Sequence, residues 1–472
     1  ILCQEKVADN RIMIFQNKKS TSKHLYSVEI KSLHESFTLP PKKLEIRISS
    51  KFNGYGNPLT ACVPRFREDI PVVVYFRALG VLTDREITQI IWGSLDDPHV
   101  ELLAASFRDA SELGIFTQQE AISYLTNHLQ YGTNQEDKCA YVRQLLNSEL
   151  LPHVRFAGEL TTTPMHNARK TMLMGSMIQR LLLTYCKQIP LDDRDAYPNK
   201  RVVTTGSLLT HLFRQLFQKV CNDTRNEFVQ EVNNDTWKRG EAPRPMEILN
   251  TNNLYKILKL SAIEGKLKQA LATGNFAVQG LGTVSSMSNA SKVGVSQVLG
   301  RMSYAATISH LRRIQTPVEK SGKLLAPRKL HGTSWGFMCP VETPEGHSVG
   351  IVKNMSLLTS ISQHVPSSTV LHFLQDDARL TWISTPKIYT GTSITVNGVL
   401  VGYTNKPYEV VSSLKLAKQT RRLHPHISIA WYTMMNNISI ETDGGRCVRP
   451  VFRKGSEPPK AVSYTHLRAH ET

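Results

Sequence analysis

The chain has 472 residues, with 20% charged and 40% hydrophobic residues, which is typical of a folded protein of several domains and disfavours intrinsic disorder. Its formal net charge of +18 favours polyanionic partners, nucleic acid ahead of acidic protein. The sequence contains no run of 18 apolar residues, so we expect no membrane span. The chain begins with Ile1 rather than Met, so we expect its natural N-terminus to lie upstream.

The seven cysteines are scattered along the chain and no two have the spacing of a metal chelate. We therefore predict no structural zinc site, a reducing compartment, and cysteines that act as small buried apolar residues.

The excess positive charge is concentrated in one part of the chain. Residues 273–354 hold nine Lys and Arg against three acids, a net +6 in 82 residues. Residues 1–272 carry the same net +6 over more than three times that length. The dense part is where we expect a nucleic acid to bind.

Strand patterns give way to helical patterns in the first half of the chain. Leu44–Ser49 alternates with a period of two, as a half-buried strand does. The apolar run 70–76 fits either a buried strand or the end of another element. From about residue 85 to 190 apolar residues recur at helical spacing, and the methionines of 172–183 are expected to fill the core.

Three carboxylates then follow within four residues, at Asp192, Asp193 and Asp195. They lack the spacing of a calcium loop, and basic residues such as Lys200 lie close by. We expect ion pairs here rather than a metal site.

The second half combines a long helix, a loop and strands. Residues 206–220 have a helical pattern with Ser207 as its N-cap, and 277–294 has the composition of a flexible loop. After residue 355 strand patterns dominate, and Asn397-Gly398 predicts a type I′ turn in a hairpin.

Polar and basic residues recur between Gly294 and Arg313. A helix through this stretch would place Gln297 and Arg301 on one face, and the side chains at its end would be basic. Those at the end are His310, Arg312 and Arg313. On periodicity alone, a solvated helix with a basic C-terminus is the better interpretation.

A stretch rich in Pro and Gly follows at residues 335–354. Pro344 fixes a backbone angle and Gly346 permits conformations closed to other residues, so the stretch can hold Glu342 and Glu345 in set positions. Carboxylates that accept hydrogen bonds from backbone amides of the turn are the alternative. No P-loop, nucleophile elbow, HExxH or dinucleotide fingerprint supports a hydrolase, an ATPase or a dehydrogenase.

Four motifs, in this order and spacing, resemble the second-largest subunit of multisubunit DNA-directed RNA polymerases. They are Gly294-Val-Ser-Gln-Val-Leu299, Ser309-His-Leu-Arg-Arg-Ile-Gln-Thr-Pro317, Pro327-Arg-Lys-Leu-His331 and Cys339-Pro-Val-Glu-Thr-Pro-Glu-Gly346. The resemblance extends over nearly all of residues 1–460 and is closer to the RNA polymerase II type, or to its homologues in large DNA viruses, than to the bacterial subunit. It implies that the chain is a fragment of such a subunit.

The resemblance implies a mixed α/β (α+β), multidomain fold built from four consecutive parts. These are a lobe-like domain (1–196), the C-terminal part of a protrusion (197–272), a fork (273–354) and external domain 1 (355–460). Val462–Thr472 instead resembles a translated sequencing adapter, and we expect it to be an artefact.

The implied function is DNA strand separation and positioning of the RNA–DNA hybrid during transcription, with Ser285–Lys292 as the strand-separating loop. The residues implied to contact nucleic acid are Gln297, Arg301, His310, Arg312, Arg313, Arg328, Lys329 and Lys353. Pro344 and Glu345 are implied to form part of the active-site wall. The loop looks longer than usual, and Gly300 and Phe276 depart from the family pattern.

The implied enzyme is a DNA-directed RNA polymerase, a nucleotidyltransferase that works as a complex. The chain lacks the Asp-Phe-Asp-Gly-Asp motif of the largest subunit, so we assign it no catalytic residue and no metal ligand. Mg²⁺ would be bound mainly by the largest subunit, and the isolated fragment would not polymerise.

The implied partners are the largest and the smaller polymerase subunits, template DNA and the RNA–DNA hybrid, with no membrane. The implied location is the nucleus, or the virion or host cytoplasm for a viral homologue, and not the secreted space. A stand-alone basic nucleic-acid-binding protein and a protein-interaction scaffold are the alternatives.

Overall fold

The computed structural model describes residues 1–17, 22–36, 41–130, 135–155, 163–233, 258, 261–276, 293–318, 322, 324–383, 391–452 and 461–465. The chain divides into two units, each made of segments distant in sequence. Unit 1 comprises Ile1–Lys6, Asp195–Ile361 and Gly445–Arg449, and unit 2 comprises Val7–Arg194, Ser362–Gly444 and Pro450–Thr472. Both contain helices and strands, which confirms the predicted mixed α/β, multidomain class.

The first sheet of unit 2 is antiparallel, with its strands in sequence order. The strands are β2 (Met13–Gln16), β3 (His24–Ser32), β4 (Lys42–Ser49), β5 (Leu59–Cys62) and β6 (Ile70–Pro71). The α-helices that accompany it are α1 (Val72–Ala78), α2 (Asp84–Trp92), α3 (Ala104–Glu112), α4 (Gln118–Asn127), α5 (Gln135–Ser148) and α6 (Thr163–Tyr185). Two 3₁₀ turns, η1 (Val100–Leu103) and η2 (Pro152–Val154), lie between them.

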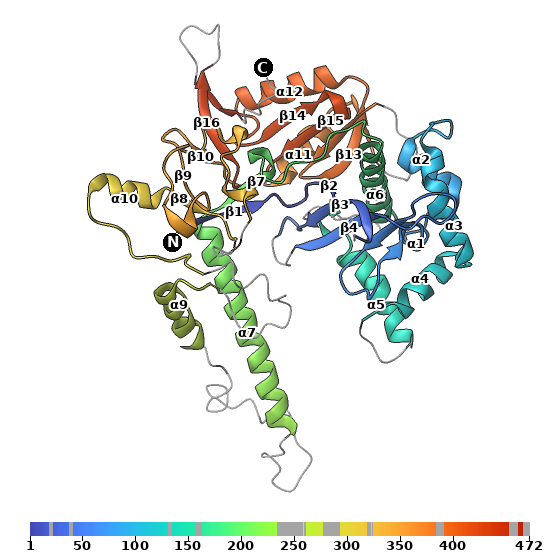
Figure 1. Ribbon diagram of the computed structural model, residues 1–472, viewed down its shortest axis with the longest axis horizontal. Helices are drawn as coiled ribbons and strands as arrows, with labels where there is room; N and C mark the ends of the chain where they lie inside the picture. Colours follow the sequence, from blue (N-terminus) through green and yellow to red (C-terminus); the bar gives the residue numbers. More distant parts are fainter. Residues whose placement is uncertain are drawn as a thin grey trace. The chain divides into compact units, whose positions relative to one another are not determined.

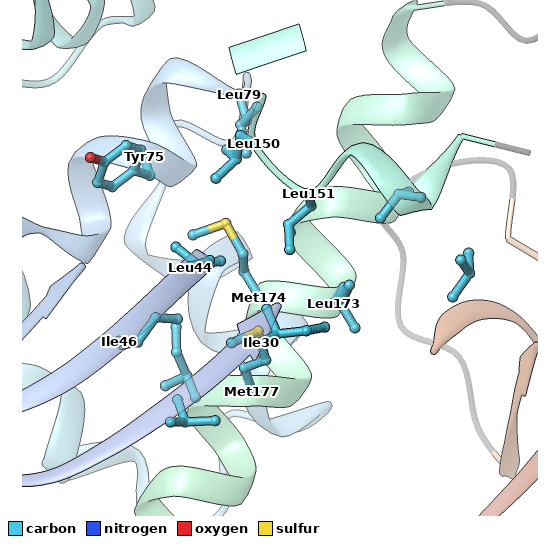
Figure 2. Packing of buried hydrophobic residues seen from close by; sticks show 14 of the residues in the cluster. Ile30, Leu44, Ile46, Tyr75, Leu79, Leu150, Leu151, Leu173, Met174 and Met177 are labelled. Carbon is cyan, nitrogen blue, oxygen red and sulfur yellow. The ribbon is translucent and has the colours of Figure 1, made fainter. Parts of the chain in front are cut away.

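Helix α6 provides much of the core of this sheet. Figure 2 shows Met174 and Met177 of α6 beside Ile30, Leu44 and Ile46 of the strands. Both methionine side chains are 0% exposed, which confirms that they fill the core. Burial alternates along β4, as the period of two predicts.

The apolar run 70–76 is not one buried strand, because it contains the end of a strand and most of a helix. Its first two residues belong to β6, and the helix α1 begins at Val72. All residues of α1 are buried, so no polar face marks its helical period. Three consecutive valines in the sequence instead favour a strand.

The second sheet of unit 2 has the order β11 (Leu380–Trp382), β13 (Val399–Thr404), β12 (Thr392–Val396), β15 (Asn437–Glu441) and β14 (Ser428–Tyr432). The helices α11 (Ser367–Gln375) and α12 (Pro407–Gln419) and the 3₁₀ turn η10 (Thr433–Met435) complete this part. Asn397 and Gly398 join β12 to β13 with φ values of 49° and 81°, which confirms the predicted turn.

Unit 1 is built around a four-stranded sheet. Its order is β7 (Lys200–Val203), β1 (Cys3–Val7), β8 (Arg313–Gln315) and β9 (Val352–Asn354). Strand β8 runs parallel to β1 and antiparallel to β9. The short strand β10 (Ser360–Ile361) pairs with the first two residues of β16 (Cys447–Phe452). The last described strand of the chain, β17 (Ala461–Thr465), falls in unit 2.

The described residues of unit 1 form three α-helices and four 3₁₀ turns. They are α7 (Thr205–Asn233), α9 (Ser261–Thr273), α10 (Tyr304–Leu311), η3 (Tyr197–Asn199), η7 (Ala326–Arg328), η8 (Gly332–Ser334) and η9 (Gly346–Ser348). Helix α9 packs beside the long α7, where Leu212, Leu216 and Ala270 are buried (Figure 1). Because α7 begins at Thr205, Ser207 lies within the helix and the prediction that it is the N-cap was wrong.

The seven cysteines are free thiols. Five are half-buried, but Cys186 and Cys221 are exposed, so the expectation that all are buried was wrong for these two. None of the described helices combines the length and the apolarity that crossing a bilayer requires.

Candidate nucleic-acid interface

The basic region, residues 273–354, lies within unit 1, and the structure describes its residues 273–276, 293–318, 322 and 324–354. Residues 293–303 are turns and irregular chain, and helix α10 starts only at Tyr304. The Ser303 side chain caps this helix by accepting a hydrogen bond from the Ala306 amide at 3.1 Å. The prediction that Gln297 and Arg301 share a helical face was therefore wrong.

A local reason for the late start is visible in the backbone. Gly294 has a φ of 76°, and the hydroxyl of Thr307 donates to the Gly300 carbonyl at 2.8 Å. Glycine is a poor helix former, and the Gly300 carbonyl, which precedes α10, accepts a side-chain hydrogen bond instead of a helical one. The spacing of apolar residues in the sequence does not show that side chains compete with the helix for these backbone groups.

His310 holds the segment before α10 in place. The Gly300 amide donates to His310 Nδ1 at 3.0 Å, so the ring proton lies on Nε2, which donates to Gln297 Oε1 at 3.0 Å. The Gln297 amide group in turn donates to the Gly294 carbonyl at 3.1 Å. Burial and the nearby Arg313 charge lower the pKa of His310, which favours this neutral form.

Arg312 is occupied by the backbone of the next turn. Its Nη2 lies 2.6 Å from the Ser356 carbonyl oxygen, 3.2 Å from that of Thr359 and 3.4 Å from that of Leu357. A guanidinium with several carbonyl acceptors is a structural clamp for the turn that follows β9.

Arg328 has a similar place beside the turn at residues 346–350. Its Nη1 donates to the His347 carbonyl at 2.7 Å and to the Val349 carbonyl at 3.1 Å. Gly350 has a φ of 70°, and a Cβ there would lie 2.1 Å from the Arg328 carbonyl oxygen. Only glycine permits this close approach, as the density of Gly and Pro indicated.

The two glutamates of the Pro- and Gly-rich stretch differ in their surroundings. The Ser309 hydroxyl donates to the Glu342 carboxylate, and the Asn354 amide donates to the Glu342 carbonyl at 3.1 Å. Glu345 is exposed and precedes η9, and Pro344 beside it is half-buried. Glu345 forms no hydrogen bond or ion pair through its side chain with the residues that the structure describes.

Lys353 lies in a buried ion cluster. Its ammonium group is 3.0 Å from Glu5 Oε2, and Lys200 Nζ is 3.1 Å from Glu5 Oε1. Thr316 donates to Glu5 Oε2 at 2.8 Å, and Asp195 lies 3.4 Å from Lys200. The side chains of Glu5, Lys200 and Lys353 are only 3%, 7% and 15% exposed.

The cluster, which we call the Glu5 cluster, holds two acids and two ammonium groups. Burial by itself raises the pKa of Glu5, but Lys200 and Lys353 outweigh it and leave this pKa below its ordinary value. Glu5 is therefore ionised at neutral pH, and the cluster is electrically balanced. Both ammonium groups also lie 5.5 Å from the centroid of the Tyr197 ring.

Three of the predicted cations have no such internal role. The side chains of Arg301, Arg313 and Lys329 form no hydrogen bond or ion pair with any residue in the described part of the chain. Arg301 and Lys329 are exposed, and Arg313 is half-buried at the start of β8.

Sequence reasoning missed Glu5, and it named Lys200 only as a partner for the nearby aspartates. Glu5 is a single acid in a short strand, and its partner Lys353 lies 348 residues away in the chain. No local pattern marks such a pair. The alternation of Cys3 and Glu5 on one face of β1 is the only signal, and it is a weak one.

No group of three or more His, Cys, Asp or Glu side chains suited to a metal ion occurs among the described residues. The carboxylates near residue 192 form ion pairs instead, as predicted. Asp192 lies 3.3 Å from Arg180 Nη2 and accepts from the Ile14 amide, whereas Asp195 pairs with Lys200.

Family comparisons match three parts of the chain. Residues 8–203 match RNA polymerase Rpb2, domain 2, residues 297–361 match RNA polymerase Rpb2, domain 3, and residues 394–453 match RNA polymerase Rpb2, domain 4. The chain is 34% identical over 461 residues to the DNA-directed RNA polymerase II subunit 2 of Arabidopsis thaliana. The chain belongs to the family of second-largest RNA polymerase subunits.

Other relatives in this RNA polymerase family give the same picture. The RNA polymerase II subunit RPB2 of Encephalitozoon cuniculi is 34% identical over 455 residues, and the RNA polymerase subunit Rpo2 of Sulfolobus acidocaldarius is 28% identical over 465 residues. Each of these three alignments covers 96% of the chain but only 36% or 37% of the relative. The chain thus spans just over a third of the length of these polymerase subunits, and its 297–361 part corresponds to their third domain.

Proposed function

We propose that the chain forms part of the second-largest subunit of a DNA-directed RNA polymerase, and that its fork, residues 273–354, positions nucleic acid for transcription. The observation that supports this most is the division of the predicted cations into two groups. Arg312, Arg328 and Lys353 hold the backbone and the sheet together, whereas Arg301, Arg313 and Lys329 have no internal partner among the described residues.

The second group supplies the electrostatic contact. Each cation that meets a phosphate releases condensed counterions, which makes binding more dependent on salt and raises the magnitude of the salt slope by about 0.9 per contact on duplex DNA. Gln297 and His310 are neutral and bonded to each other, so their role would be to shape the segment and to offer polar contacts to bases or sugars.

Residues 344–350, which we call the Pro344–Glu345 turn, would form part of the wall beside the active site. Arg328 and Gly350 fix the turn at its base, so the exposed Glu345 carboxylate is held on a stiff support. The predicted strand-separating loop, Ser285–Lys292, lies outside the described residues.

The reaction of the complex would be template-directed nucleotidyl transfer, in which Mg²⁺ stabilises charge on the attacking and leaving oxygens. We propose that this ion is held mainly by the largest subunit. This chain would contribute binding and positioning. Purified alone, it should incorporate no nucleotide into a primed RNA–DNA template.

The partners would be the largest and the smaller polymerase subunits, template DNA and the RNA–DNA hybrid. Relatives named as RNA polymerase II subunits favour the nucleus as its location, and a viral origin would move it to the virion or host cytoplasm.

Co-purification tests the subunit proposal against a stand-alone binding protein or a scaffold. The tagged chain is co-expressed with a largest polymerase subunit that carries Asp-Phe-Asp-Gly-Asp, and washed in high salt to remove complexes bridged by nucleic acid. We expect the largest subunit to remain bound. A folded chain that binds hybrid but retains no subunit would favour a stand-alone binding protein, and the proposal would fail.

A further inference from the structure

The two strands within the basic region are short. Strands β8 and β9 have three residues each, and β8 lies between β1 and β9 in the sheet. A ladder of three residues has few backbone hydrogen bonds to hold its register, and a shift of one residue would move each side chain to the opposite face.

The register determines on which face each basic side chain lies. Cys3 is level with Ile314 and Gln4 with Gln315 in the parallel pair, so Glu5 follows beside Thr316. Ile314 is opposite Lys353 in the antiparallel pair, and Arg313 is opposite Asn354. Because successive side chains alternate, Lys353 shares the face of Ile314, and Arg313 lies on the other face.

The Glu5 cluster joins the strands on one side of this sheet. One carboxylate contacts Lys200 of β7, Lys353 of β9 and Thr316, which directly follows β8. A slip of β9 by one residue would turn the Lys353 ammonium group away from Glu5. The buried Glu5 carboxylate would then keep only one of its two cations, Lys200. Buried charged groups are costly when unpaired, so the cluster penalises every other register.

We propose that Glu5 is a positioning residue: its carboxylate sets the register of β8 and β9 and so the placement of Arg313 and the Pro344–Glu345 turn. Glu5 itself touches no nucleic acid. This inference rests on the proposed function, because it assigns Glu5 a role in the same binding segment.

A double-mutant cycle on the 472-residue chain tests the proposal. Binding to an RNA–DNA hybrid is measured from low to moderate salt for the unmodified chain, Glu5→Gln, Arg313→Ala and the double variant. Lys353→Met is measured as well, alone and with Arg313→Ala, because it frees β9 while Glu5 keeps Lys200 and Thr316.

The chain offers a matched control in unit 2. Glu29 is also a buried carboxylate between two cations, 2.6 Å from Arg194 and 2.7 Å from Lys43. Glu29→Gln removes the same charge from a similar setting outside the basic segment, so it should leave the salt slope unchanged.

We expect Glu5→Gln and Lys353→Met each to lower the salt slope by about 0.9, the loss of one phosphate contact, as Arg313→Ala does. In the Arg313→Ala background neither should lower it further, since the contact is already lost. Equal losses in both backgrounds would overturn the positioning role, because a general structural defect adds to the loss of Arg313. An Arg313→Ala variant with an unchanged slope would instead contradict the proposed function of Arg313 itself.

If Glu5→Gln fails to fold, the Lys353→Met cycle decides in the same way. Should both variants keep the full slope and affinity while folded, the register does not depend on the cluster and the inference is refuted.

Discussion

The replacement Arg312→Ala separates a structural arginine from one that binds nucleic acid. The Arg312 guanidinium donates to three carbonyl groups of the 356–359 turn, the shortest contact being 2.6 Å. A hydrogen bond with a charged donor contributes about 1.5–3 kcal/mol, and Arg312 is half-buried, so we expect a local loss of about 2 kcal/mol. Because about 1.4 kcal/mol changes an equilibrium tenfold, the turn should open about 30 times more often.

Native-state hydrogen exchange measures this opening directly. The amides that report it are those of Met355, Ser356 and Thr359, which donate to the carbonyls of Arg312, Phe337 and Ser356. The matched control is Arg313→Ala, one residue away, whose side chain forms no hydrogen bond or ion pair with the described residues. It should leave these exchange rates unchanged.

The opposite pattern would refute the reasoning. If Arg312→Ala leaves the three amides as protected as before and lowers the salt slope of hybrid binding, then Arg312 is a phosphate contact and the turn is held by other groups.

Three further predictions concern unit 2. Met174→Ala removes a side chain that is 0% exposed and should cost about 2–5 kcal/mol in urea unfolding, and a loss below about 1 kcal/mol would contradict its place in the core. Thr117→Ala removes the cap of α4, whose hydroxyl accepts from the Glu120 amide at 3.3 Å, and should cost about 1 kcal/mol, with faster exchange confined to the first turn of that helix. Burial lowers the pKa of His153 to about 3, below the ordinary value of about 6.5 in the unfolded chain. The unfolded chain therefore gains a proton first, so stability present above about pH 6.5 is lost as the pH falls toward 3, and His153→Gln should flatten this acid decline in the urea midpoint.

The local sequence predicted those elements whose residue pattern fits only one kind of structure. The alternation of Leu44–Ser49 gave β4, and Asn397-Gly398 gave a turn because both residues tolerate positive φ. Met174 and Met177 of α6 lie in the same core because their spacing of three residues places them on one face of the helix.

Prediction failed where tertiary contacts override the local pattern. The pattern did not reveal the helix that begins at Val72, because every residue of α1 is buried and no polar face marks the helical period. The stretch before Tyr304 is not helical because Ser303 and Thr307 offer the backbone other hydrogen bonds.

The assignment of the basic residues of 297–353 to nucleic acid came from the resemblance and stays a prediction, because periodicity alone favoured a solvated helix. Neither could separate cations with internal partners from cations without them. That division depends on partners far away in the chain, such as Glu5 for Lys353 and the Ser356 carbonyl for Arg312.

The most direct test of this division is the salt dependence of RNA–DNA hybrid binding by the triple variant Arg301→Ala, Arg313→Ala and Lys329→Ala. Arg422→Ala, an exposed arginine of unit 2, is the control and should leave the slope unchanged. If each of the three cations meets a phosphate, the slope falls by about 2.7 in the triple variant. A folded triple variant with the slope of the unmodified chain would contradict the assignment of these cations to nucleic acid.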